Sequence, residues 1–228
     1  MKNLTLEHIA RACGGTYIGA EDKKEACVDN ISTDSRQAGK GTLFVAIKGA
    51  RVDGHNFIPQ VAEQGALAAL SERELPDCPI PYIRVESTLQ AVKDIAEYYL
   101  EQLKIPVVGI TGSVGKTSTK EMIAAVLAQK YNVLKTLGNF NNELGLPLTV
   151  FRLREEHEIA VLEMGINHFG EMHRLAKIAK PDTCVITNIG YCHLENLIDR
   201  DGVLRAKTEI FDHMKTGGTA ILNGDDDK

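Results

Sequence analysis

The 228-residue sequence has no hydrophobic run long enough to cross a membrane, because its longest apolar stretches have only the length of a strand. Its first residues, MKNLTLEH, lack the apolar core of a secretory signal peptide. No sign of charge dominates: 26 Lys and Arg stand against 31 Asp and Glu, a formal net charge of −5. This balance indicates neither a nucleic-acid nor a membrane-surface partner. We therefore expect a soluble, cytoplasmic protein without a membrane span.

Cysteine is scarce and follows no pattern. The five cysteines stand at positions 13, 27, 78, 184 and 192, and no two of them form a C-x-x-C pair. An odd number without such pairs argues against a disulfide framework and against a zinc site. The sequence predicts reduced thiols, each buried on its own. Internal repeats and low-complexity segments are also absent.

The first hundred residues mix helix and strand patterns. Thr5 is suited to cap a helix over LEHIARAC that ends at Gly14-Gly15. Strands are expected at VDNIS, TLFVAI and PYIRV, and a helix is expected at NFIPQVAEQ, before the apolar run ALAAL. A long helix from Ser87 to Leu103 then follows. Its predicted inner face consists of Leu89, Val92, Ala96, Tyr99 and Leu103. The connector Lys104-Ile105-Pro106 closes a small mixed α/β domain over residues 1–104.

From residue 105 onward, strand and helix patterns alternate regularly. Strands are expected at IPVVGI, NVLKTL, EIAVLEM, CVITNI and TAILN, with helices after residue 115, after Gly170 and after Asp201. Such alternation predicts a doubly wound, mostly parallel sheet over residues 105–228. Ligands of this architecture bind at the carboxyl ends of the strands.

The stretch GITGSVGKTSTKEM, residues 109–122, joins an expected strand to an expected helix with Met122, Ile123, Val126 and Leu127 at helical spacing. Glycines in such a turn let backbone N–H groups face an anion, and the helix N-terminus adds unpaired donors. Gly115-Lys116-Thr117 supplies the end of a P-loop, although Ile110 stands where the usual first glycine would be. An ordinary strand-to-helix turn is the alternative. We favour binding of a nucleoside triphosphate.

Lys116 is expected to reach the β- and γ-phosphates, and Thr117 to offer its hydroxyl to Mg²⁺. The predicted nucleotide-binding residues are Thr111, Gly112, Ser113, Val114, Gly115, Lys116, Thr117 and Ser118, with Asn139 and Asn142 from the segment TLGNFNNELGLPLT. The amides of that segment can orient a polar ligand, but turn chemistry explains its Asn and Gly residues equally well. No N-K-x-D motif is present, which speaks against a GTPase switch.

Two further side chains follow strand ends near the loop. Glu163 ends EIAVLEM, where a carboxylate would hold Mg²⁺ directly or through water, unless it is simply a solvated charge. His193 follows CVITNI, and spacing alone leaves a ligand role and an ordinary solvated histidine equally open.

Lys207 lies within the expected helix GVLRAKTEIFDHM, in the middle of an apolar stripe. The stripe consists of Val203, Ile210, Phe211 and Met214. Desolvation there predicts a lowered lysine pKa and a neutral amine that can react with carbon dioxide to give a carbamate. Alternatively, the stem packs on the core while the ammonium reaches solvent or pairs with Glu163.

Together these segments resemble the ATP-dependent Mur ligases of peptidoglycan synthesis. The resemblance covers nearly the whole chain: STDSRQAGKGTLFVAIKGARVDGHNFI in the first domain, then ITGSVGKTSTKEM, LGNFNNELGLPLT, LEMGINHFGEM, ITNIGYCHLENL and AKTEIF in the second. GNFNNELGLPLT and EMG…GEM are most similar to the branch that adds D-alanyl-D-alanine. They differ from the MurE branch, which shares the DSR and DGH segments.

The resemblance implies that ATP phosphorylates the terminal carboxylate of UDP-MurNAc-tripeptide and that the amine of D-Ala-D-Ala attacks the acyl phosphate. It implies ATP and Mg²⁺ as cofactors, with Lys116, His193 and Lys207 as catalytic residues. Thr117 and Glu163 match the family's first metal site, and His193 matches a ligand of the second, which a carbamylated Lys207 helps to place. In the first domain, the residues that match the UDP-sugar cradle are Ser35, Arg36, Asp53, Gly54 and His55.

The family's ligases carry a third, C-terminal domain, whereas this sequence stops at NGDDDK. We therefore expect an incomplete ATP-binding domain, a monomer, and a chain that binds the UDP-sugar without completing the ligation. Two alternatives stay open. One is another ligase of the superfamily, MurE-like or of the folylpolyglutamate synthase type. The other is a non-catalytic nucleotide-binding module that acts through a protein partner.

Overall fold

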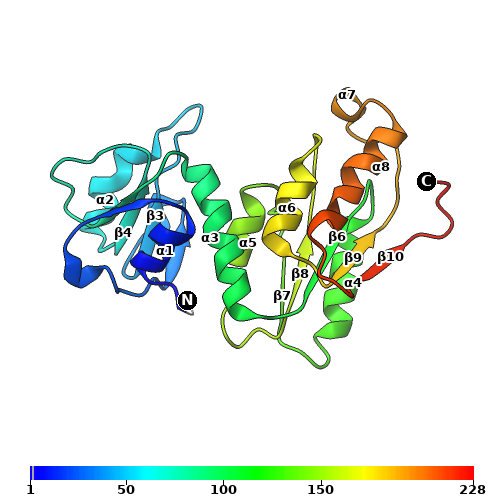
Figure 1. The fold of residues 1–228 in the computed structure, drawn as a ribbon, viewed down its shortest axis with the longest axis horizontal. Helices are drawn as coiled ribbons and strands as arrows, with labels where there is room; N and C mark the ends of the chain where they lie inside the picture. Colours follow the sequence, from blue (N-terminus) through cyan, green and yellow to red (C-terminus); the bar gives the residue numbers. More distant parts are fainter. Residues whose placement is uncertain (2) are drawn as a thin grey trace. The chain divides into compact units, whose positions relative to one another are not determined.

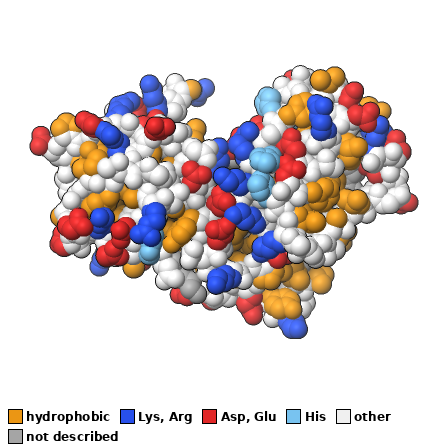
Figure 2. Space-filling view, in the orientation of Figure 1, with side chains coloured by type: hydrophobic (Ala, Val, Ile, Leu, Met, Phe, Trp, Pro, Cys, Tyr) orange, Lys and Arg blue, Asp and Glu red, His pale blue; other side chains and the backbone are white. Residues whose placement is uncertain are grey.

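The computed structural model describes residues 1 and 3–228. These residues separate into two compact units, Met1–Gln102 and Leu103–Lys228 (Figure 1). On the face that Figure 2 shows, acidic and basic side chains are interspersed over each unit. No helix of the described residues is long and apolar enough to span a membrane.

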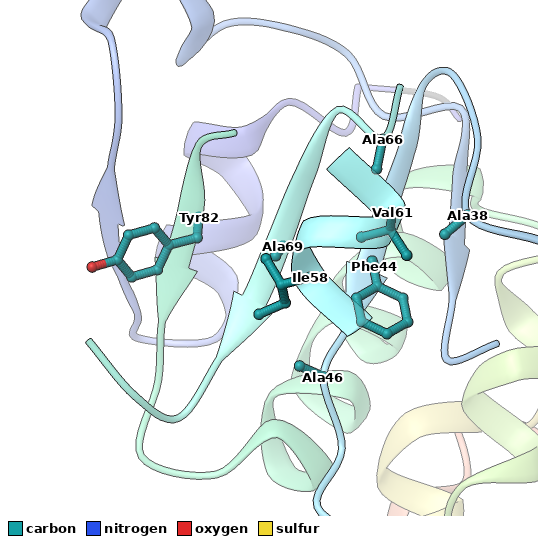
Figure 3. Packing of buried hydrophobic residues seen from close by; sticks show 8 residues of the cluster. All are labelled: Ala38, Phe44, Ala46, Ile58, Val61, Ala66, Ala69 and Tyr82. Carbon is teal, nitrogen blue, oxygen red and sulfur yellow. The ribbon is translucent and has the colours of Figure 1, made fainter. Parts of the chain in front are cut away.

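The first unit is built on a five-stranded sheet of order β1-β5-β4-β3-β2. Its elements are α1 (Leu6–Ala12), β1 (Thr16–Ile18), η1 (Glu21–Lys23), β2 (Asn30–Ser32), η2 (Ser35–Gln37), β3 (Thr42–Val45), η3 (Gly54–Phe57), α2 (Ile58–Glu63), β4 (Ala68–Ser71), β5 (Tyr82–Arg84) and α3 (Thr88–Leu103). Only β1 runs antiparallel to its neighbour among these described strands. In the core, Ile58 and Val61 of α2 lie against strand residues that include Phe44 and Ala69 (Figure 3).

Most local predictions for this unit are confirmed. Thr5 caps α1, and its hydroxyl accepts a hydrogen bond from the His8 amide at 3.2 Å. The strand β1 was not anticipated, because three residues are too few for a periodic pattern. Leu89 was wrongly assigned to the inner face of α3: it is 47% exposed, whereas Ala91 and Ile95 are buried. Val92, Ala96 and Tyr99 are buried as predicted, so the buried stripe is only shifted from the predicted one, toward Ala91 and Ile95.

The second unit contains a fully parallel sheet of order β10-β9-β6-β8-β7. Its elements are β6 (Val107–Thr111), α4 (Lys116–Leu127), β7 (Val133–Lys135), α5 (Gly145–Val150), β8 (Ile159–Glu163), α6 (Glu171–Ala179), β9 (Thr183–Ile186), α7 (Leu194–Leu197), α8 (Arg200–Thr208), η4 (Glu209–His213) and β10 (Thr219–Leu222). All five predicted strands are present, and the α/β class is confirmed.

Both faces of this sheet are covered, as the period-two alternation of β6 requires. Val108 and Ile110 pack in one cluster with Ala124 of α4. Gly109 points the other way, where a Cβ atom would lie 2.4 Å from Met164 Cε and 3.5 Å from Ile210 Cδ1. A side chain at the centre of β6 would therefore have to displace the end of the Met164 side chain, whereas Ile210 of η4 would lie at ordinary van der Waals distance.

Three details of the second unit differ from the sequence predictions. Met122 and Val126 of α4 are 69% and 72% exposed, because the helix turns Lys120 and Ala124 toward the sheet instead. The short helices α5 and α7 were not predicted, and α5 begins inside the segment TLGNFNNELGLPLT, for which ligand contacts and turn chemistry were both considered. The expected helix after Asp201 is α-helical only to Thr208 and continues as the 3₁₀ turn η4.

The cysteine prediction is partly wrong. All five cysteines are free thiols, as expected, but only Cys184 is buried. Cys27 is exposed, and the other three are half-buried. Burial raises the pKa of Cys13 and of Cys184 to about 11, so both stay protonated thiols.

Candidate functional site

The loop between β6 and α4 has a backbone that only glycine accommodates at two positions. Gly112 has φ +144°, and a Cβ atom there would lie 1.9 Å from Thr187 Oγ1. Gly115 has φ +80° and forms the N-cap of α4. Positive φ values are strained for residues with a side chain. The glycines of the motif are thus explained by the shape of the loop itself.

The loop is fastened to the segment that follows β9. The Ser113 amide donates to Asn188 O, and the Val114 amide donates to Asn188 Oδ1, both at 3.1 Å. Thr187 Oγ1 donates to Val114 O at 2.6 Å, and the Gly190 amide donates to Ser113 Oγ at 2.9 Å. The Ser113 and Val114 amides are therefore already bonded. The amides of the first turn of α4 and the Lys116 ammonium are the groups that stay available for an anion here.

Lys116 lies folded over its own loop. Its ammonium donates to Gly112 O at 2.8 Å and to Ser113 O at 3.3 Å. Both acceptors are neutral carbonyls, and a phosphate oxygen is a stronger, charge-assisted acceptor. The side chain can exchange one for the other by rotating about its flexible stem. Thr117 and Ser118 are exposed at the start of the helix.

Glu163 is buried at the end of β8, in register with Ile110 of β6, and its side chain is 2% exposed. Its Oε1 accepts a hydrogen bond from Asn141 Nδ2 at 2.8 Å. Its Oε2 makes no hydrogen bond to any described residue and lies 3.5 Å from Lys120 Nζ. Thr111 Oγ1, one residue further along β6, is also buried and without a hydrogen bond in the described part of the chain.

Two buried oxygens at neighbouring strand ends thus lack a hydrogen bond in the described residues, although Glu163 Oε2 has Lys120 as an ionic neighbour. Burial without hydrogen bonds is costly, which favours a ligand at this place. A carboxylate and a hydroxyl oxygen are the donors that a hard cation such as Mg²⁺ prefers. The residues present therefore fit the predicted metal. No three His, Cys, Asp or Glu side chains among residues 1 and 3–228 form a ready metal-binding group, so phosphate or water oxygens would complete the coordination.

Lys207 is 1% exposed on α8, so its ammonium does not reach solvent. Burial, which is the largest cause, and the nearby Lys116 charge together lower the pKa of Lys207 to about 8, while Cys192 opposes the shift. The cation that the structure pairs with Glu163 is Lys120, not Lys207. His193, next to Cys192, is exposed and has φ +53° as the N-cap of α7.

The asparagines of the segment after β7 have separate positions. Asn142 Oδ1 accepts from the Leu144 and Gly145 amides at 3.2 and 2.8 Å, so it supports the start of α5. Asn139 is exposed. Asn141, which the sequence did not single out above its neighbours, holds Glu163. Lys120 was also missed, although its spacing of four from Lys116 places both on one side of α4.

In the first unit, the DGH segment is held by its own hydrogen bonds. His55 Nδ1 lies 2.6 Å from Asp53 Oδ1, and the Glu72 amide donates to His55 Nε2 at 3.1 Å. These bonds assign the ring proton to Nδ1. Gly54 is needed because a Cβ atom there would lie 2.8 Å from the backbone of Ile47. A direct contact between His55 and a ligand stays a prediction.

The other first-unit candidates lie at η2. Ser35 is half-buried, and Arg36 is exposed and pairs with Asp34 at 2.7 Å. The hydrogen bonds from Arg36 lower the pKa of the Asp34 carboxyl to about 2. The guanidinium thus already has a carboxylate partner, which a ligand would have to share or replace.

A parallel sheet whose central strand leads through a glycine loop into a helix, with a buried carboxylate on the adjacent strand, defines a P-loop nucleotide-binding protein of the α/β class. Residues 110–228 match the Mur ligase middle domain, and residues 28–100 match the catalytic domain of the Mur ligase family. The chain belongs to the Mur ligase family.

The UDP-N-acetylmuramoyl-tripeptide--D-alanyl-D-alanine ligase of Bacillus subtilis is 44% identical over 224 residues, which are 97% of this chain and 49% of that protein. A crystal structure of MurF from Acinetobacter baumannii is 40% identical, with a TM-score of 0.90 over 98% of this chain and 49% of the other. MurF ligase from Thermotoga maritima, solved in complex with ADP, is 38% identical, with a TM-score of 0.79 over 86% and 46%. The chain spans about half the length of these relatives.

Proposed function

We propose that this chain forms the UDP-sugar-binding and ATP-binding parts of an ADP-forming amide ligase. The ligase joins D-Ala-D-Ala to UDP-MurNAc-tripeptide, as the names of its relatives say of those proteins. The observation that carries the proposal is the P-loop with Lys116 at the end of β6, beside the buried Glu163 on β8, whose Oε2 accepts no hydrogen bond from the described residues. We further propose that the protein is cytoplasmic and acts as a monomer.

The reaction needs two displacements. A carboxylate oxygen of the tripeptide attacks the γ-phosphorus of ATP, the bond to the β-phosphate oxygen breaks, and ADP leaves. The amine nitrogen of D-Ala-D-Ala then attacks the acyl carbon, phosphate leaves with the bonding electron pair, and the nitrogen loses a proton. Both steps build negative charge on phosphoryl or carbonyl oxygens, which fixed positive groups stabilise.

Lys116 supplies one such group. In our proposal its ammonium leaves Gly112 O and Ser113 O and binds the β- and γ-phosphate oxygens, while the first-turn amides of α4 hold the same phosphates. Thr117 and Glu163 would hold Mg²⁺, which neutralises charge on the transferring phosphoryl group when bound. The remaining nucleotide contacts belong to Thr111 through Ser118, Asn139 and Asn142.

Lys207 is proposed to act as a carbamate. Its amine nitrogen adds to carbon dioxide and releases a proton, which converts a buried cation into a carboxylate-like oxygen donor. The lowered pKa of about 8 makes the neutral amine accessible near physiological pH. With His193, this carbamate would hold a second Mg²⁺. Incubation with ¹³C-labelled bicarbonate should give a carbamate signal in the NMR spectrum that is absent from Lys207→Ala.

The UDP-sugar is assigned to residues 1–104, with Ser35, Arg36, Asp53, Gly54 and His55 around it. The hydrogen bonds of His55 to both neighbours support a role in which the ring holds the DGH loop in place. Asp53 and Gly54 then present the loop to the ligand. Arg36, which is exposed, is suited to a phosphate of UDP.

Binding measurements on the purified chain test the proposal. We expect calorimetric binding of a non-hydrolysable ATP analogue with Mg²⁺, and of UDP-MurNAc-tripeptide in preference to UDP-MurNAc-dipeptide. Preference for the dipeptide would favour a MurE-like ligase instead. Absence of both nucleotide and UDP-sugar binding, with a stable protein partner, would favour the non-catalytic module.

A further inference from the structure

A buried lysine, Lys120, stands beside the carboxylate that we assign to metal binding. Its side chain is 1% exposed, and its Nζ lies 3.5 Å from Glu163 Oε2. Lys120 follows Thr117 by three residues and Lys116 by four, so all three point to one side of α4. A cation of the protein therefore shares the place that a metal ion would occupy.

Lys120 belongs to a row of four alternating charges. Its Nζ also lies 3.3 Å from Glu121 Oε1, and Glu121 pairs in turn with Lys135 of β7. The row runs from the surface inward, because Glu121 is 48% exposed and Glu163 is buried. The charges of the two lysines and the two carboxylates in this row sum to zero. The other oxygen of Glu163 is bound by the neutral amide of Asn141, which leaves this balance unchanged.

This balance decides how a divalent cation can approach Glu163. A free ion would gain one carboxylate and meet one ammonium a few ångströms away. Repulsion at such distances is strong where water is excluded. The phosphates of a nucleotide bring several negative charges to the same side of α4, and they offset the ammonium. Metal bound to nucleotide is therefore favoured over metal alone.

We propose that Lys120 is a positioning residue that makes metal entry at Glu163 depend on nucleotide. With no phosphate present, its ammonium neutralises Glu163, orients the carboxylate and suppresses binding of a free divalent cation. The identity of the Glu163 site rests on the proposed function. The role of Lys120 itself concerns a state without nucleotide, so it can be measured without turnover.

The test uses Mn²⁺ alone as the probe, titrated into the full chain without nucleotide and followed by the paramagnetic resonance of the free ion. Lys120→Met removes the charge and keeps the apolar stem. We expect it to bind Mn²⁺ at least about tenfold more tightly than the wild type. Lys120→Arg keeps the charge and should bind as weakly as the wild type. Adding Glu163→Gln to Lys120→Met should abolish the gain, which places the ion at Glu163.

Two further variants keep the test decisive. Lys120→Gln removes the same charge but retains a hydrogen-bond donor, and it replaces Lys120→Met if circular dichroism shows that the latter is unfolded. Glu121→Gln is the matched control, since it alters the exposed neighbour of Lys120 and leaves the ammonium in place; it should not tighten Mn²⁺ binding. Unchanged or weaker Mn²⁺ affinity on removal of the lysine charge would overturn the proposal, as would a gain in Lys120→Arg.

Failure of the proposed function would be seen in a different measurement. Wild-type chain that binds no ATP analogue in the presence of Mg²⁺ would refute the nucleotide assignment. The titration of the Lys120 variants with Mn²⁺ alone would still test the role of Lys120 independently.

Discussion

The hydrogen bonds of Lys116 are made to its own loop, and a phosphate would replace them. Removing the lysine side chain should therefore weaken nucleotide binding strongly and change the free energy of unfolding only slightly. The ammonium donates to two carbonyls of its own loop. The net contribution of such a hydrogen bond to the free energy of unfolding is only about 1 kcal/mol. In Lys116→Ala we expect the free energy of unfolding to fall by no more than this.

Nucleotide affinity in Lys116→Ala should fall about a hundredfold or more, because a charge-assisted contact to phosphate is lost. Calorimetry with the ATP analogue and urea unfolding measure the two effects. Lys130→Ala, which removes an exposed lysine beyond the same helix, serves as the control. Equal nucleotide affinity in both variants would contradict the role of Lys116.

Asp53 should make the free energy of unfolding of the first unit depend on pH in the acid range. The hydrogen bond with His55 lowers the pKa of the Asp53 carboxyl to about 2, with further help from Arg73. A carboxyl with a lowered folded pKa binds fewer protons in the folded than in the unfolded state, so its contribution is complete above the unfolded value of about 4 and is lost as the pH falls toward 2.

The predicted consequence is that Asp53→Asn shows a flatter dependence of unfolding free energy on pH between about 4 and 2. Urea unfolding at a series of pH values in this window measures it. Asp22→Asn removes another carboxylate from the same unit without touching His55, and it should keep the wild-type slope. An unchanged slope in Asp53→Asn would show that the carboxyl titrates normally.

At the scale of elements, α3 offers a direct comparison of its two faces. Ile95 is fully buried and Leu89 is 47% exposed, although both are large aliphatic residues of one helix. We expect Ile95→Ala to lower the free energy of unfolding by about 2–4 kcal/mol. Leu89→Ala should change it by less than about 0.5 kcal/mol. Urea denaturation of the two variants is sufficient, and similar losses in both would contradict the observed orientation of the helix.

The same helix shows what the sequence can predict. Periodicity identified α3 as a helix and placed Val92 and Ala96 inside, but the choice between neighbouring stripes depends on tertiary packing. Helix α4 was predicted correctly, but its buried face was not, for a related reason. Its buried face contains Lys120, a residue type that is rarely buried without a partner, and that partner lies on β8, 43 positions along the chain from it.

The candidate site was predictable where the chemistry is contiguous in sequence. The loop residues from Gly112 to Thr117 follow one another, and the strand end at Glu163 carries its own hydrophobic pattern. Contacts between distant segments left no such signal. Nothing in the local sequence indicates that Asn188 fastens the loop or that Asn141 holds Glu163.

At the scale of the whole molecule, the two compact units meet along the chain near Lys104. This residue is exposed, has φ +53° and lies between the end of α3 and the start of β6. Exposed segments outside regular structure are the preferred sites of proteolysis. We expect brief treatment with trypsin to cut first at the Lys104–Ile105 bond.

Mass spectrometry should then identify fragments of residues 1–104 and 105–228 before smaller products. Lys104→Gln should remove this first cut and leave the later ones. Early cleavage after Lys130 or within the first unit would contradict the division into two units.

The strand order of the parallel sheet also sets the sequence of events during synthesis. β6 lies between β8 and β9, and the Val107 amide bonds to Asp182 Oδ2, 75 positions along the chain. Pairing between segments so distant is slow, because a long loop must close first. At about 5–20 residues added per second, β8 and β9 are synthesised several seconds after β6, so β6 cannot pair with them earlier. The glycine loop, whose Val114 amide is hydrogen-bonded to Asn188, therefore reaches its final form only after residue 188 has been synthesised.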